Sequence, residues 1–325
     1  MKSVLVTGGA GYIGSHTVRE LAGNNYHPIV LDHLKQGHAE AVPEGELIVG
    51  DLADAALLDS IFDKEKVDGV VHFAGLCYVG ESVSQPGRYY EENVGNGLTL
   101  LQVMRRHGVK KFVFSSSCAV YGDPLHLPIE EDHPKNPVNP YGESKCFIES
   151  ILRQYDRAYG LRSVSLRYFN AAGASLDGRL GESHDPEPHL IPRVLRAAQG
   201  EIEKIEIYGD DYPTRDGSCV RDYIHVQDLA IAHVAAYRWL DGASTSENFN
   251  LGTGKGYSVK EVIAEASRVT GQNIPSEVRS RRPGDPPELV ADGRKAARLL
   301  GWKPQHSELK KILSTAWTWE RNRKY

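Results

Sequence analysis

Tyr141 and Lys145 are the two residues of this sequence whose types and spacing could make a general base. Asn139 and Pro140 stand directly before Tyr141, as is typical of the N-cap and first residue of a helix. In such a helix Tyr141 and Lys145 share one face, one turn apart. A nearby ammonium lowers the pKa of a phenol, which ordinarily titrates near ~10. The pair therefore predicts proton transfer by a tyrosinate.

Three hydroxyl residues, Ser115, Ser116 and Ser117, end the apolar run that precedes this helix. A strand over 111–114 would deliver them to the edge of a sheet, near the helix that begins at Asn139. Because a Tyr-x-x-x-Lys pair also arises by chance on helix surfaces, its meaning depends on the elements that position it.

A glycine-rich turn lies close to the N-terminus. Gly8, Gly11 and Gly14 follow the apolar run 4–6 and precede a helix expected through about residue 22. Glycines between a strand and a helix allow a tight turn, close approach of the backbone to a pyrophosphate, and helix–sheet packing. The spacing is GxxGxxG, and its strand–helix context predicts a dinucleotide site.

Asp32 follows a second expected strand, 28–31, and stands 18 residues after Gly14. A dinucleotide fold uses a carboxylate there to bind the adenine ribose hydroxyls, and its charge repels a 2′-phosphate. The sequence thus favours NAD over NADP, although Lys35 is a cation that could accept a phosphate. Asp51, after a third strand at 47–49, is expected beside the adenine ring.

Composition limits the classes of function. The chain has 325 residues, a net charge of −5 and a pI near 6.2, which argues against nucleic acid or an anionic membrane as the main partner. Four scattered cysteines without a CxxC pair indicate reduced thiols and a cytoplasmic location. No apolar run approaches ~18 residues, and the N-terminus offers no room for a signal segment before the glycine turn.

Strands and helices alternate over about 170 residues, which predicts an α/β fold with a doubly wound parallel sheet. We expect a cofactor-binding Rossmann domain over 1–168, to which residues 222–252 return as a helix and strand. Residues 169–325 are expected to form a smaller, discontinuous mixed α/β substrate domain, with helices near 190–199, 226–241, 258–270 and 307–320. The cleft between the domains is the default substrate site.

Taken in order, these motifs resemble the UDP-glucose (UDP-galactose) 4-epimerases of the extended short-chain dehydrogenase/reductase superfamily. The matching segments span most of the chain and are residues 6–16, 72–75, 79–82, 114–117, 120–122, 140–142, 166–170, 209–214, 220–226 and 282–285. The resemblance implies an isomerase of galactose metabolism with tightly bound NAD. It would epimerise C4 of a UDP-sugar through a 4-keto intermediate. It also implies a homodimer formed through helices near 84–107 and 140–159.

The resemblance assigns site residues by matched position. The implied catalytic residues are Tyr141, Lys145 and Ser117. Those implied for NAD binding are Gly8, Gly11, Tyr12, Ile13, Gly14, Asp32, His33, Asp51, Leu52, Phe73, Ala74, Gly75, Ser115, Tyr141, Lys145 and Tyr168. Those implied for the UDP-sugar are Ser117, Tyr141, Asn170, His189, Arg221, Arg282 and Asp285.

Four positions depart from the family pattern. Cys77 stands where many members have a lysine, and Glu92 stands where asparagine is usual, beside Asn93. His189 often has an asparagine counterpart, and Leu289 replaces a tyrosine or a smaller residue that lines the sugar pocket. Because of these departures, the sequence does not decide which sugar the substrate carries. The alternatives are UDP-glucose/UDP-galactose, UDP-xylose/UDP-arabinose and the UDP-N-acetylhexosamines.

Rival functions lack residues that they need. A nucleotide-sugar dehydratase requires an acidic pair directly after the catalytic hydroxyl, and Cys118-Ala119 follow Ser117. A non-catalytic NAD sensor on the same fold would typically have lost Tyr141 or Lys145.

The segment 184–189 could also suggest metal ligands, because it contains His184, Asp185, Glu187 and His189. Pro186 and Pro188 fix it as an extended loop and no further ligand is evident. We therefore expect no metal and a loop that contacts the nucleotide.

Overall fold

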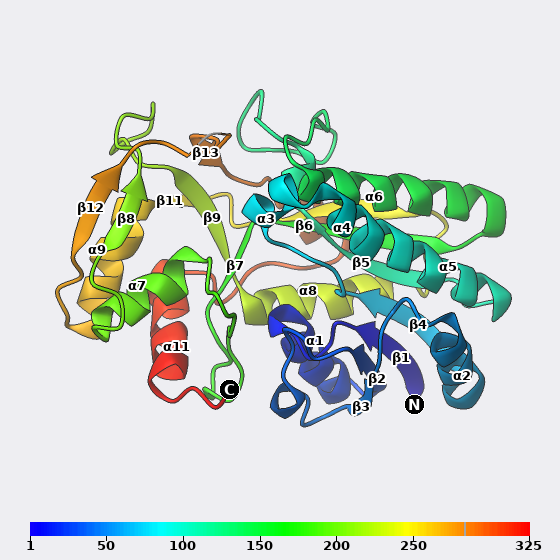
Figure 1. Ribbon diagram of the computed structural model, residues 1–325. Helices are drawn as coiled ribbons and strands as arrows, with labels where there is room; N and C mark the ends of the chain where they lie inside the picture. The colour runs from blue at the N-terminus through cyan, green and yellow to red at the C-terminus, as the bar shows by residue number, and fades with distance from the viewer. Residues whose placement is uncertain (283) are drawn as a thin grey trace.

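A large parallel sheet forms the centre of the protein, as seen in a computed structural model that describes residues 1–282 and 284–325 (Figure 1). In the described part of the chain seven strands follow the order β10-β6-β5-β4-β1-β2-β3, and every neighbouring pair is parallel. Their bounds are β1 Lys2–Thr7, β2 Tyr26–Asp32, β3 Glu46–Val49, β4 Val67–His72, β5 Lys111–Ser117, β6 Arg162–Tyr168 and β10 Glu247–Leu251. The predicted doubly wound sheet is confirmed.

Helices cover both faces of this sheet (Figure 1). On one face α1 (Tyr12–Gly23) and α8 (Val226–Trp239) pack into a core that includes Val18 and Leu229. On the other face α2 (Ala55–Glu65), α5 (Asn96–Arg106) and α6 (Pro140–Tyr159) share a second core. Burial on both faces explains the continuous apolar runs in the strands.

Chain order reverses at β1, which pairs with β2 on one side and β4 on the other. Ligands of such sheets bind at the carboxyl ends of strands beside this switch point. The glycine turn follows β1, so it lies at the expected location.

Helix α6 begins where the sequence predicts. The Asn139 side chain accepts a hydrogen bond from the Gly142 amide at 2.9 Å, and Pro140 is the first helical residue. Gly160, with φ of 67°, ends the helix in the left-handed conformation that glycine adopts without strain.

A smaller domain lies beside the carboxyl ends of the strands (Figure 1). Among its described residues are a four-stranded sheet and a parallel pair, β8 with β12. The strands are β7 Asn170–Ala172, β8 Ile205–Tyr208, β9 Val220–His225, β11 Gly256–Ser258, β12 Ser276–Arg279 and β13 Glu288–Leu289. Its helices are α7 Leu190–Ala198, α9 Val259–Thr270 and α11 Leu309–Arg321, which pack together over a shared apolar core, whereas α10 Arg294–Leu299 packs against β10 of the large sheet.

Residues 226–251 of the expected segment 222–252 return to the large sheet, whereas residues 222–225 lie in β9 of the smaller sheet. Helix α8 packs against α1, and β10 pairs with β6 at the sheet edge. The expected helical segment 84–107 differs from the prediction, because a π-helical turn, η2 (Glu91–Gly95), separates the short α4 (Pro86–Tyr90) from α5. The other short helices are η1 Ala39–Ala41, α3 Val79–Ser84 and η3 Cys118–Val120.

No helix among the described residues is long and apolar enough to cross a membrane. Position 283 of the 282–285 motif falls outside the described residues.

Candidate functional site

Two positions around the turn between β1 and α1, Gly8 and Gly14, have room only for glycine. Gly8 has φ of +71°, and a Cβ there would lie 2.6 Å from the Ala74 amide nitrogen. A Cβ on Gly14 would lie 2.2 Å from the Gly8 carbonyl oxygen. Gly11 stands at the N-cap and Tyr12 and Ile13 begin the helix, whose first amides have no carbonyl one turn earlier to bind. These amides and the helix dipole form a cradle suited to a pyrophosphate.

Asp32 stands at the end of β2 beside this turn. Its carboxylate is 7% exposed and accepts hydrogen bonds from the Ala10 amide at 3.0 Å and the Leu34 amide at 2.9 Å. The charge is thereby held in one orientation next to the cradle. Lys35, the cation that could accept a 2′-phosphate, lies 3.8 Å from the Asp51 carboxylate.

The other residues predicted to bind the adenine end of NAD lie at the same edge of the sheet. The His33 ring accepts a hydrogen bond from the Lys35 amide, and the Asp51 carboxylate accepts one from the Ala53 amide at 3.0 Å. Leu52 is buried in the core beneath α2. Thus Asp32, His33 and Asp51 surround the ends of β2 and β3.

The end of β4 approaches the glycine turn closely. The Phe73 and Ala74 amides both donate to the Thr7 carbonyl, at 2.9 and 3.0 Å. Gly75 follows with φ of +156°, in a backbone conformation that other residues rarely adopt. This stretch therefore presents backbone rather than bulky side chains to the cradle.

Asn93 holds the segment after Gly75 in place by hydrogen bonds. Its sequence position alone did not indicate this role. Its amide group accepts from the Leu76 amide at 2.7 Å and donates to the Leu76 carbonyl and the Ser144 hydroxyl, both at 3.0 Å. Glu92, the departure noted in the sequence, instead accepts from Asn96 along the helix. Asn93 lies in the π-helical turn η2, a conformation that concentrates at functional sites but that only the structure reveals.

The predicted catalytic side chains converge at the ends of β5 and α6. The Lys145 ammonium is 6% exposed, donates to the Ser115 carbonyl at 2.9 Å and lies 5.7 Å from the centre of the Tyr141 ring. The hydroxyls of Ser115 and Tyr168 share a hydrogen bond. Ser117 ends β5, and its Oγ accepts from the Ala119 amide at 3.2 Å.

The electrostatics of Tyr141 differ from the expectation. Burial raises the pKa of Tyr141 well above its ordinary value, although a hydrogen bond with Ser117 acts in the opposite direction. Burial also lowers the pKa of Lys145 to about 8. Both groups are desolvated, and desolvation disfavours the charged form of each. In the protein without its cofactor, burial therefore dominates the pKa of Tyr141, and the lowering expected from Lys145 together with a nicotinamide stays a prediction.

A buried ionic network fixes α6 against the sheet. Arg167, on β6, donates from Nε and Nη2 to both carboxylate oxygens of Glu149 on α6, at 2.8 and 2.7 Å. Ser116 and Lys135 also donate to this carboxylate, at 2.8 and 3.0 Å. Burial opposes ionisation of Glu149, yet the Arg167 guanidinium holds the pKa of Glu149 below its usual value. The network therefore positions the helix that carries Tyr141 and Lys145.

The nucleotide-side residues lie in the smaller domain. Arg221, on β9, pairs with Asp285 and donates to the Val220 carbonyl at 2.8 Å. Leu289, on β13, is the register partner of Arg221. The guanidinium carbon of Arg282 lies 3.8 Å from the centre of the Tyr208 ring. Arg221 and Asp285, predicted as two separate nucleotide contacts, therefore also bind each other.

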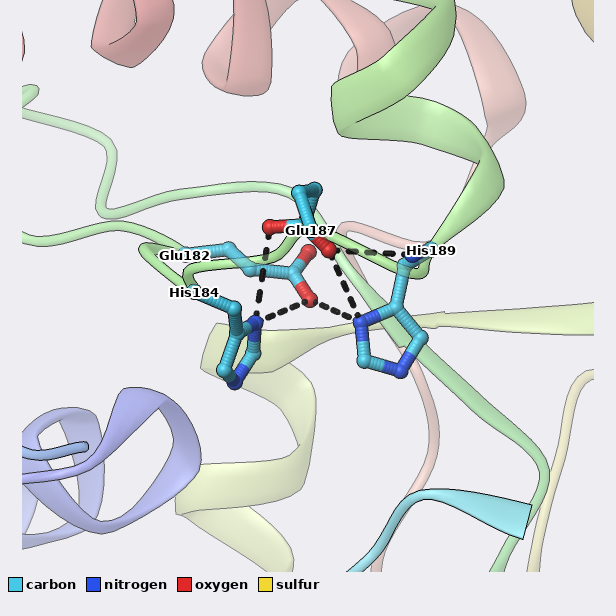
Figure 2. A group of neighbouring side chains, drawn as sticks. All are labelled: Glu182, His184, Glu187 and His189. Atoms are coloured by element: carbon cyan, nitrogen blue, oxygen red, sulfur yellow. Dashed lines mark hydrogen bonds and ion pairs between the residues drawn. The ribbon is translucent and has the colours of Figure 1, made fainter. Parts of the chain in front are cut away.

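Asn170 and His189 lie on two further elements of this domain. Asn170 begins β7 two residues after Tyr168 and pairs with Tyr223 of β9. His189 is the N-cap of α7 and contacts Glu182, His184 and Glu187 (Figure 2). Cys77 is an exposed residue, yet burial of its thiol raises the pKa of Cys77, and the charges of His189 and Lys145 oppose that shift. Cys77 thus lies between the catalytic pair and this cluster.

Comparison with known proteins identifies the relatives of this arrangement. The sequence model of the NAD dependent epimerase/dehydratase family matches residues 4–252. A UDP-glucose 4-epimerase of Halalkalibacterium halodurans is 53% identical over 98% of this chain and 96% of its own length. The crystal structure of UDP-glucose 4-epimerase from Brucella ovis in complex with NAD is 50% identical, with a TM-score of 0.95 and 98% of each chain covered.

A second structure, UDP-glucose 4-epimerase from Bifidobacterium longum in complex with NAD⁺ and UDP, is 42% identical with a TM-score of 0.93 and 99% of each chain covered. The family model covers well over half of the chain, and these relatives match it almost from end to end. These three relatives are UDP-glucose 4-epimerases, and the chain belongs to the NAD dependent epimerase/dehydratase family.

Proposed function

We propose that this protein interconverts UDP-glucose and UDP-galactose by NAD-dependent epimerisation at C4. The observation that carries the proposal is the convergence of Tyr141, Lys145 and Ser117 at the strand edge that also bears the glycine turn. The family membership and the UDP-glucose 4-epimerase names of the relatives support the same activity.

The residues around the glycine turn suit NAD. The phosphates would lie at Gly11, Tyr12 and Ile13, where Gly8 and Gly14 keep the backbone close. Asp32 would accept hydrogen bonds from the adenine ribose, and its fixed negative charge disfavours a 2′-phosphate. The remaining contacts would come from His33, Asp51, Leu52, Phe73, Ala74, Gly75, Ser115, Tyr141, Lys145 and Tyr168.

Bound NAD⁺ supplies a positively charged ring that accepts hydride from C4 and returns it to the opposite face of the sugar. Tyr141 takes the proton from the 4-hydroxyl as the 4-keto sugar forms, and gives it back after the sugar has turned. Ser117 holds the 4-oxygen by a hydrogen bond. Lys145, fixed by the Ser115 carbonyl, stabilises the tyrosinate.

Bringing the pKa of a phenol from ~10 to near ~7 requires about 4 kcal/mol. Burial of Tyr141 acts in the wrong direction, so the required stabilisation must exceed that figure. Two positive charges in a buried site, one of them Lys145, can provide it because their interaction with the tyrosinate is poorly screened.

The UDP moiety would lie across the smaller domain. Arg221 and Arg282 offer planar guanidinium groups suited to a diphosphate, and Asp285 offers a carboxylate for the uridine ribose. The ion pair between Arg221 and Asp285 keeps both side chains in place. Asn170 and His189 would contact the sugar.

We infer a division into a cofactor domain, residues 1–168 with 222–252, and a substrate domain formed by the rest of 169–325. The cysteines Cys77, Cys118, Cys146 and Cys219 are free thiols, which suits the cytoplasm. A homodimer through α5 and α6 is supported by Phe147 and Tyr159, which are apolar, exposed and on α6. Light scattering after gel filtration measures the oligomeric state, and a monomer at micromolar concentration would refute the dimer.

The activity is tested by following UDP-glucose by NMR with purified protein and no added cofactor. UDP-galactose should appear until equilibrium is reached. Parallel reactions with UDP-N-acetylglucosamine and UDP-xylose identify the preferred sugar, and conversion of none of the three refutes the proposal.

Replacement of Tyr141 by phenylalanine tests the general base. Y141F should reduce kcat by about 10²–10⁴-fold, the usual contribution of a general acid–base group. Tyr159→Phe, on the same helix but exposed, is the matched control and should retain activity. Full turnover by Y141F would exclude Tyr141 as the base.

A further inference from the structure

Four side chains of the loop between β7 and α7 converge on one point (Figure 2). His189 Nδ1 lies 2.6 Å from Glu182 Oε1 and 3.2 Å from Glu187 Oε1. His184 Nδ1 lies 3.4 Å from Glu182 Oε1 and 3.4 Å from Glu187 Oε2. Each imidazole nitrogen thus faces both carboxylates. Glu182 is the further partner that the sequence analysis did not identify.

Hydrogen bonds account for only part of this arrangement: Glu187 Oε1 lies 3.2 Å from His189 Nδ1 in a hydrogen bond and also accepts from the His189 amide. His184 Nδ1 and Glu187 Oε2 are both buried, and neither has a hydrogen-bond partner among the described residues. The Glu187 side chain is only 1% exposed, so water cannot readily satisfy it. A buried carboxylate oxygen that faces a nitrogen without a hydrogen bond is costly unless a third group lies between them.

The separations fit a tetrahedral metal site. Zinc binds histidine nitrogen and carboxylate oxygen at about 2.0–2.2 Å, which places tetrahedral ligands about 3.3 Å apart. Three of the four nitrogen–oxygen distances, 3.2, 3.4 and 3.4 Å, match this value. The fourth, 2.6 Å between His189 Nδ1 and Glu182 Oε1, is shorter, so these two atoms would move apart by about 0.7 Å when the metal binds. We propose that Glu182, His184, Glu187 and His189 bind one divalent transition-metal ion, with Zn²⁺ as the first candidate.

Charge and ligand chemistry favour this choice. Two glutamates balance a divalent ion, and neutral imidazoles complete the set without excess charge. Imidazole suits Zn²⁺ and its first-row neighbours, whereas a site for Mg²⁺ or Ca²⁺ would be built from oxygen alone. The ligand atoms lie within 4.8 Å of one another, so small shifts of the side chains would bring all four onto one metal ion.

Neighbouring groups orient the ligands. The Glu187 carboxylate also accepts from the His189 amide at 2.9 Å, and the Trp319 indole donates to the Glu182 carbonyl at 2.8 Å. The Tyr78 ring packs edge-on against His184. Such outer contacts typically fix the geometry of metal ligands. His189 is 43% exposed, which leaves an entry path on its side of the cluster.

A metal here would fix a loop whose start is already bound to the glycine turn. The Tyr12 hydroxyl, on the glycine turn, donates to the Gly173 carbonyl at the start of the same loop. His189 would be held through Nδ1, which leaves Nε2 available to the sugar. The proposed metal therefore positions His189 and takes no part in hydride transfer.

Metal content is the first test. The full-length protein, expressed with zinc in the medium and purified without a chelator or a histidine tag, should contain about one zinc per chain by plasma mass spectrometry. Glu187→Gln should reduce the zinc content at least tenfold, with an unchanged circular dichroism spectrum. The matched control is His27→Ala, because His27 lies in a more exposed group with Glu46 and Glu65. H27A should keep its zinc.

Calorimetry on chelator-treated protein is the second test. Addition of Zn²⁺ should give one site per chain with a Kd below a micromolar, and Glu182→Gln should weaken it at least a hundredfold. Manganese and magnesium, titrated separately, should bind more weakly. Absence of zinc from the purified protein, together with no saturable heat on titration, would refute the site. Equal zinc binding by E187Q, E182Q and the parent protein would refute the ligand assignment.

Discussion

Replacement of Lys145 by methionine isolates the contribution of one positive charge to the proposed base. Methionine fills a similar buried volume and removes the ammonium, which lies 5.7 Å from the centre of the Tyr141 ring. At an effective dielectric constant of about 20, a tyrosinate at that distance interacts with the ammonium by roughly 3 kcal/mol. This corresponds to a change of about two units in the pKa of Tyr141.

The direction follows from the role of Tyr141. The reaction needs the deprotonated phenol, so activity is present above its pKa and lost below it. With the pKa of Tyr141 moving from near ~7 to near ~9, K145M should therefore reduce kcat about 25-fold at pH 7.5. The rate should then rise about tenfold per pH unit, with the midpoint of the pH profile shifted upward by about two units.

The assay is kcat for UDP-glucose between pH 6 and 10, at saturating substrate and with NAD content measured on each sample. Lys111→Met is the matched control, because Lys111 begins β5 and pairs with Asp68 and Asp241 at the opposite end of the sheet. A K145M variant that keeps its NAD and loses activity without any shift in pH profile would refute the electrostatic role of Lys145.

Three further predictions concern the cofactor turn, the sugar pocket and acid stability. Gly14→Ala should lower the NAD content of the purified protein at least tenfold, because its Cβ would lie 2.2 Å from the Gly8 carbonyl oxygen. Gly23→Ala is the control, because it has open space around it and should retain NAD. The NAD content of both variants is measured by chromatography. Leu289→Ala should raise kcat/KM for UDP-N-acetylglucosamine relative to UDP-glucose, and an unchanged ratio would contradict a role for Leu289 in the pocket. Burial lowers the pKa of His233 to about 4, whereas the same side chain titrates near 6.5 in the unfolded chain. The stability that the buried neutral imidazole contributes is therefore fully present above pH 6.5 and is lost as the pH falls towards 4. Between pH 6.5 and 4.5, the free energy of unfolding should therefore fall by about 2 to 3 kcal/mol less in His233→Gln than in the parent protein, as measured by urea unfolding. Equal falls in the two proteins would contradict this assignment.

Local signals predicted much of the fold from the sequence. The start of α6 follows from Asn139 and Pro140, whose effects act within one helical turn. The order of strands and helices follows from apolar runs bounded by glycine and polar residues, and the parallel sheet is confirmed. The family and the cofactor chemistry of its members are confirmed by the comparisons, whereas the roles of individual residues stay predictions.

Long-range contacts could not be predicted in the same way. Arg167 and Glu149 are 18 residues apart on different elements, and only the packing of α6 on β6 makes them a pair. Glu182 joins His184 and His189 because the loop closes on itself, which spacing alone does not specify. The pKa of Tyr141 depends on burial by the whole fold, so a pair of residues on one helix could not reveal its direction.

The central claim is that C4 is oxidised and then reduced by the same bound cofactor. UDP-glucose deuterated at C4, incubated with the protein in ordinary water without added NAD, tests it directly by NMR of the product. The account predicts UDP-galactose that retains deuterium at C4. Product that has lost the label to solvent, or the absence of UDP-galactose, would contradict it.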